Sequence, residues 1–160
     1  DSFTSRGLGD VYKRQIGHGR QLAAILGMGA EGVLVGTRVL VAEEVWSHPE
    51  IKKQVVNAGA ADSTLVMASF RNTSRVINNE YARTVQKLEH KGVTDFDQYW
   101  PYVKGSNAFD AYTTGDWDKA LLSMGQAATF ANNVAPMQVI FDDLIDQAKY
   151  AVERMSSLTK

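Results

Sequence analysis

A short apolar run between two glycines, Gly32–Thr37 (GVLVGT), most strongly constrains what this chain can fold into. A continuous apolar stretch of this length is typical of a strand buried on both faces, as in a parallel sheet. Just before it, Gly19–Leu26 places apolar side chains at helical spacing, and Gly27 and Gly29 are typical of a helix C-terminus. A helix, a glycine turn and a buried strand in such quick succession predict a βα repeat structure.

The residues after this run continue the pattern. Thr37 is a candidate N-cap for a helix over residues 38–45, and Ser47 is a candidate cap for a helix over residues 50–56, with Pro49 near its start. We therefore interpret residues 16–56 as the last βα units of a parallel α/β structure.

Residues 57–160 have a different character and predict a mainly α-helical extension. A loosely alternating stretch at 64–70 favours a strand, and residues 104–113 carry the weakest pattern. Apolar side chains at helical spacing predict three longer helices and one short helical piece, at residues 73–90, 95–99, 116–130 and 136–155.

Composition excludes several classes of function. The chain of 160 residues has a formal net charge of −1 with acids and bases interspersed, so no nucleic-acid or membrane partner is expected. It contains no cysteine, which excludes thiolate metal sites, disulfides and a cysteine nucleophile. No apolar stretch is long enough for a membrane span, and we expect a cytoplasmic protein. Asp142, Asp143 and Asp146 lie on the polar side of the last predicted helix, so we expect a solvated face and no metal site.

The first fifteen residues show no periodicity and no capping pattern. Residues 10–15, DVYKRQ, match the translation of a transposon mosaic-end sequencing adapter. We therefore predict that residues 1–15 are not native, that the natural gene is interrupted just before Ile16, and that an upstream part of the protein is missing.

Gly36 and Thr37 form the candidate ligand site. A glycine at the end of a buried strand allows close backbone approach, and the N-terminus of the next helix offers free N–H groups to a phosphate. In (β/α)₈ barrels, a phosphate site is common after strands seven and eight. The same pattern also fits a tight βα turn without a ligand.

The stretch from Ile16 to Val56 resembles the nitronate monooxygenase family, formerly called 2-nitropropane dioxygenases. Family members carry Gly-Gly-Ile-x-x-Gly-Arg, then a helix, then Leu-Gly-Ala-x-Gly-Val-x-x-Gly-Thr-Arg. The residues that match these two blocks are Ile16, Gly19, Arg20, Gly29, Ala30, Gly32, Val33, Gly36, Thr37 and Arg38. Weaker similarity continues through residues 71–75, 115–118 and 123–126.

This resemblance implies an α/β fold, the C-terminal part of a (β/α)₈ (TIM) barrel followed by the helical extension, and FMN as cofactor. It further implies oxidation of alkyl nitronates with dioxygen as co-substrate. The implied FMN contacts are Gly17, Val35, Gly36 and Thr37. The Gly-Gly pair expected before Ile16 is replaced by Arg14-Gln15, and the family's catalytic histidine lies upstream. The chain should therefore hold no catalytic residue and be inactive alone.

Three alternatives remain open from the sequence. The FMN-dependent enoyl-acyl carrier protein reductases carry a similar Gly-Thr-Arg block. A barrel dehydrogenase of the IMP type has the same kind of phosphate site. A non-catalytic helical interaction domain, with glycines serving turns only, is the alternative of another class.

Overall fold

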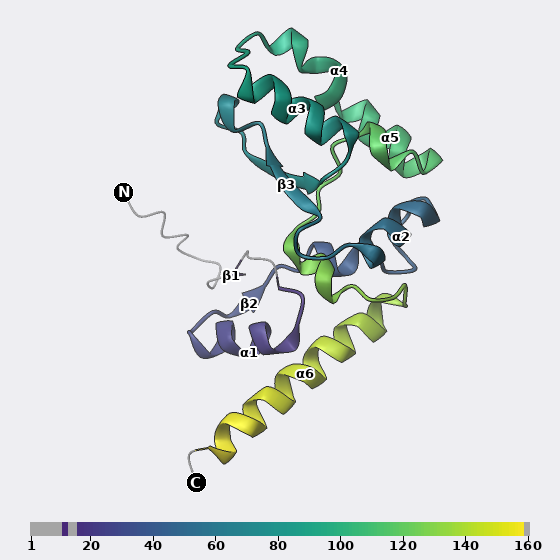
Figure 1. Ribbon diagram of the computed structural model, residues 1–160. Helices are drawn as coiled ribbons and strands as arrows, with labels where there is room; N and C mark the ends of the chain where they lie inside the picture. The colour runs from purple at the N-terminus through teal and green to yellow at the C-terminus, as the bar shows by residue number, and fades with distance from the viewer. Residues whose placement is uncertain (1–10, 13–15, 159–160) are drawn as a thin grey trace.

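The computed structural model describes residues 11–12 and 16–158, and it begins with a βαβ unit (Figure 1). Strand β1 (Val11–Tyr12) pairs in parallel with β2 (Gly32–Val33), and helix α1 (Gly19–Gly27) connects them. The predicted helix and the parallel pairing are confirmed. The predicted strand over residues 32–36 forms only at its first two residues, and Leu34 is 52% exposed.

Both residues of β1 lie in the segment, residues 1–15, that the sequence predicts to be non-native. Most of that segment lies outside the described residues, so its origin stays a prediction.

The long C-terminal helix α6 (Met137–Ser157) runs alongside α1 (Figure 1). Its predicted apolar stripe is buried at Ile140 and Leu144, whereas Val152 and Met155 further along are about half exposed. At about 1.5 Å per residue, the nine residues of α1 can cover less than half the length of α6. Val152 and Met155 line an open apolar groove together with Leu22 and Leu26 of α1.

The main hydrophobic core joins residues from both predicted parts of the chain. Most of the described members of this core come from the segments after β2, from helix α2 (Pro49–Asn57), and from the C-terminal segments around residues 120–144, and Ile77 and Ala111 complete it. Its most deeply buried side chains include Val41, Val55, Leu122, Met124, Ile140 and Leu144.

The helix predicted at residues 38–45 is wrong. A single 3-10 turn, η1 (Thr37–Val39), takes its place, and the chain then runs past Ala135 through a β-bridge from Ala42. The buried Lys52 donates from Nζ to the carbonyl oxygen of Ala42, at 2.6 Å, so this backbone serves tertiary contacts and not a helix. The N-cap of α2 is also His48, not the predicted Ser47.

A second, smaller core lies under a hairpin and three helices. Strand β3 (Ser63–Val66) pairs antiparallel with β4 (Ser74–Ile77), and α3 (Glu80–His90), α4 (Trp100–Val103) and α5 (Gly105–Thr114) follow. The helix predicted from residue 73 starts seven residues later, because residues 74–77 pair with β3. Asn79 then caps α3 by accepting a hydrogen bond from the N–H of Ala82 at 2.9 Å.

The helix predicted at residues 116–130 is also wrong. Short 3-10 turns, η4 (Trp117–Lys119) and η5 (Gln126–Phe130), flank an extended segment that bridges to β4. Ala120, Leu122 and Met124 are buried while Ser123 between them is exposed. This period of two is a strand period, and it explains why apolar residues here do not mark a helix face.

We predict that Asn79→Ala destabilises the protein by about 2–4 kcal/mol, through loss of a helix cap and of two buried hydrogen bonds. The fully buried Asn79 also donates from Nδ2 to the carbonyl oxygens of Trp117 and Ala120, both at 2.7 Å. Urea unfolding measures the change. The exposed Asn132→Ala is the control and should stay within about 0.5 kcal/mol; equal effects of the two substitutions would contradict the assignment.

Candidate functional site

Three segments far apart in sequence meet at the predicted ligand site: the loop before α1, the turn after β2, and η5. The hydroxyl oxygen of Thr37 accepts a hydrogen bond from the N–H of Gly125 at 2.9 Å. Gly17 packs so closely on Phe130 that an added Cβ would lie 2.6 Å from its ring. The structure thus brings Gly17, Gly36 and Thr37 around η5, and Val35 packs against the main core behind them.

The N-terminus of α1 has side-chain acceptors for its free N–H groups. The N–H groups of Gly17 and His18 donate to Oε1 of Gln21, at 2.9 and 3.1 Å. Gly19 N–H donates to Oε1 of Gln147 at 2.9 Å, and Arg20 N–H donates to Nδ1 of His18 at 3.1 Å. Each of these donors would be available to a phosphate only if its side-chain acceptor moved away.

This capping was readable in the sequence but was missed. His18 as N-cap and Gln21 three residues later form a capping box, and a Gln at this spacing after a cap is a known helix-start signature. The role of Gln147 had no sequence signal, because it lies 128 residues from its partner Gly19.

The turn at Gly36 and Thr37 is different. Within residues 16–158, neither backbone N–H of this pair has a hydrogen-bond acceptor. Gly36 is exposed, and nothing lies within 4 Å of the position that a Cβ would take. This half of the predicted phosphate site therefore presents two donors that have no acceptor among the described residues, and Gly36 has open space beside it among those residues.

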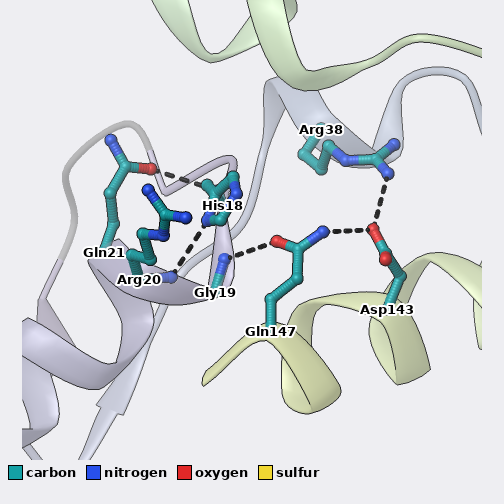
Figure 2. A network of polar contacts seen from close by, with 7 residues as sticks. All are labelled: His18, Gly19, Arg20, Gln21, Arg38, Asp143 and Gln147. Carbon is teal, nitrogen blue, oxygen red and sulfur yellow. Dashed lines mark hydrogen bonds and ion pairs between the residues drawn. The ribbon is translucent and has the colours of Figure 1, made fainter. Parts of the chain in front are cut away.

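Arg38, next along the chain, is buried with 6% of its surface exposed. Its Nη2 donates to Oδ2 of Asp143 at 3.5 Å, while Nη1 is buried and has no acceptor among the residues that the structure describes. Oδ2 of Asp143 also accepts from Nε2 of Gln147 at 2.8 Å (Figure 2). A buried guanidinium needs a counter-charge, and Asp143 supplies it.

The other acids of α6 behave as predicted. Asp142 accepts from Gln138 and Asp146 pairs with Lys149, both on the solvent side. Within the described part of the chain, no cluster of three or more His, Asp or Glu side chains could hold a metal ion. Asp143 differs from its neighbours only because Arg38 lies opposite.

Shifted pKa values belong to groups away from these three segments. Burial raises the pKa of Tyr112, and burial together with the charge of Glu89 raises the pKa of Tyr99. A hydrogen bond from Gln54 lowers the pKa of Glu50, and one to Asp116 raises the pKa of Lys119.

In the described ranges, no helix has both the length and the apolar content to cross a membrane.

The sequence pattern that defines the family described as nitronate monooxygenase matches residues 15–147. The chain belongs to the nitronate monooxygenase family. It is 28% identical to a nitronate monooxygenase of Neurospora crassa over 163 residues, covering 97% of this chain and 42% of that protein.

Solved structures support the fold. FabK from Thermotoga maritima superposes with a TM-score of 0.86 at 26% identity, covering 95% of this chain and 48% of its own. A nitroalkane oxidase from Streptomyces ansochromogenes gives a TM-score of 0.72 at 21% identity, covering 93% of this chain and 42% of its own, and so supports the fold. The predicted partial (β/α)₈ barrel of the α/β class is confirmed. The chain spans less than half the length of each of these three proteins.

We predict that Gly19→Ala destabilises the protein by about 2 kcal/mol or more, because its Cβ would overlap the carbonyl oxygen of Leu144 and the backbone of Ala148. Gly27→Ala, at the other end of the same helix, meets no atom within 4 Å and should be neutral or stabilising by up to about 1 kcal/mol. Urea unfolding of the two variants makes the comparison. Similar stabilities would show that α1 does not depend on close contact with α6.

Proposed function

We propose that the protein to which this chain contributes is an FMN-dependent oxidoreductase that oxidises alkyl nitronates with dioxygen. The observation that carries this proposal is the pair of adjacent N–H groups at Gly36 and Thr37, which have no acceptor within residues 16–158, in a chain of the nitronate monooxygenase family. In this proposal the chain supplies part of the FMN phosphate site. The catalytic residues belong to barrel strands outside it, since the chain spans 42% of its Neurospora relative.

The chemistry of the turn fits a phosphate. Two adjacent N–H donors, with open space beside Gly36, are what a doubly charged phosphate requires. The Thr37 hydroxyl oxygen accepts from Gly125, so its own hydrogen remains available to donate to a phosphate oxygen. Val35 holds the turn by packing against the main core. When bound, the flavin would supply the redox chemistry between nitronate and dioxygen.

Gly17 enters this proposal on different terms. Its N–H donates to Gln21, so it can reach a phosphate only after the Gln21 side chain turns away. Its lack of a Cβ already matters, because that space is taken by Phe130 and Ala127. We assign Gly17 to the shape of the phosphate site. The Gly36–Thr37 turn provides the main hydrogen bonds to the phosphate.

A matched pair of glycine substitutions tests the site in the whole protein. Gly36→Ala places a methyl group where the phosphate approaches, and loss of one charge-assisted hydrogen bond, about 1.5–3 kcal/mol, weakens FMN binding roughly tenfold or more. Gly32→Ala has equally open surroundings and lies in β2, so FMN affinity should stay within about twofold.

Fluorescence titration with FMN gives both affinities. Normal binding by the Gly36→Ala variant would refute the phosphate site. A whole protein that purifies colourless and takes up no FMN would refute the flavin function. Turnover that requires a nicotinamide and an enoyl thioester would favour the reductase alternative.

We also predict that the 160-residue chain alone binds FMN poorly and oxidises no nitronate. In the described part of the chain, the sheet next to the site consists of two residues per strand, and an open edge of this kind cannot enclose a cofactor. Oxygen consumption with an alkyl nitronate measures the activity. Robust turnover by the chain would contradict the placement of the catalytic residues outside it.

A further inference from the structure

Helix α6 contacts both segments that the proposed phosphate site needs. On one side, Gly19 at the start of α1 lies directly against the backbone of α6 at Leu144 and Ala148. On the other side, Arg38 reaches α6 from the turn that carries Gly36 and Thr37. The two segments are separate in sequence, since Gly36 follows Gly19 by 17 residues, so α6 is a common support for both.

Gln147 uses both ends of its amide in this support. Oε1 accepts from the N–H of Gly19 at 2.9 Å, and Nε2 donates to Oδ2 of Asp143 at 2.8 Å (Figure 2). An amide that donates at one end and accepts at the other has one correct orientation. The carboxylate of Asp143, which can only accept, therefore sets the orientation in which Gln147 can cap α1.

Asp143 connects this amide to the other segment. The same Oδ2 accepts from Nη2 of Arg38 at 3.5 Å. Figure 2 shows the resulting series of hydrogen bonds, which runs from Gly19 through Gln147 and Asp143 to Arg38. Arg38 is buried, and it has no other carboxylate partner within residues 16–158. Because a buried cation depends on its counter-charge, the position of Arg38 and of the adjoining Thr37 is coupled to Asp143.

We propose that Gln147 and Asp143 are positioning residues that set the spacing between the Gly17–Gly19 loop and the Gly36–Thr37 turn. This proposal rests on the proposed FMN function for its consequence, which is affinity for the phosphate end of the cofactor. Neither residue touches the phosphate; both act through Gly19 and Arg38.

Two variants test the series of hydrogen bonds from Gly19 to Arg38. Gln147→Met removes both amide contacts while keeping a long, helix-compatible side chain. Asp143→Ala instead removes the oxygen that accepts from both Gln147 and Arg38, and it leaves the Gln147 side chain in place. Each variant should therefore break the connection between the two segments, at a different residue.

The same helix offers a matched control. Gln138 donates from Nε2 to Oδ1 of Asp142 at 2.9 Å, with the same spacing of four residues, and both side chains are exposed. Gln138→Met therefore removes an equivalent pair that supports neither segment, and all readouts should match the wild type.

The first readout is hydrogen exchange without flavin, measured on the chain and on the whole protein. Gln147→Met should speed exchange roughly fivefold or more, the equivalent of one lost hydrogen bond, in peptides covering residues 17–20 and also 39–40. The N–H groups of Val39 and Leu40 donate to the carbonyl oxygens of Gly36 and Thr37, so their exchange reports on the turn. Asp143→Ala should speed exchange in the same two sets of peptides. Faster exchange at residues 17–20 alone in the Gln147→Met variant, with 39–40 unchanged, would reduce Gln147 to a simple helix cap and overturn the proposal.

The second readout is flavin affinity of the whole protein, with riboflavin as the probe that lacks the phosphate. Gln147→Met and Asp143→Ala should each weaken FMN binding roughly fivefold or more and leave riboflavin binding unchanged. Equal losses for both flavins would overturn the positioning role. A wild-type protein that binds neither flavin would refute the proposed function, while the exchange data would still decide the coupling.

Discussion

The close packing of Gly19 on the backbone of α6 is the contact on which the rest of the structure depends. Only a residue without a Cβ allows α1 to start at this distance from Leu144 and Ala148. That approach puts Gly19 N–H within reach of Gln147, and it places the loop before α1 against η5. The turn after β2 reaches the same two elements through Thr37 and Arg38. The C-terminal segments of the chain therefore hold both parts of the site.

The two parts differ in how their backbone donors are satisfied. At the start of α1, side chains of Gln21, Gln147 and His18 accept from four consecutive N–H groups. A helix N-terminus attracts negative charge, and neutral side-chain acceptors meet the same need. At Gly36 and Thr37 the donors have no acceptor in the described residues, because the turn is short and opens outward. Because of this difference, we assign the main hydrogen bonds to the phosphate to the turn.

Several elements could be predicted from local pattern and others could not. The helix from Gly19 and the long C-terminal helix were correct, since periodicity and the glycine at the helix end agreed. The stretch over residues 116–130 was wrong because its apolar residues fit both helical and strand periods, and pairing with β4 selected the strand period. Likewise, residues 74–77 became a strand because β3 lay beside them. Apolar spacing alone does not distinguish these outcomes when a partner strand is supplied from elsewhere.

By itself, the sequence determined the family, the βαβ order of the first elements, the absence of thiol chemistry, and the glycine and threonine of the candidate turn. These follow from residue types and spacings within a few tens of residues. Only the tertiary structure decided which donors are free and which are capped, and that Asp143 faces Arg38 while Asp142 and Asp146 face solvent. The partners in those contacts lie up to 128 residues apart. Hydrogen bonding over such separations depends on how helices pack, and no local pattern records it.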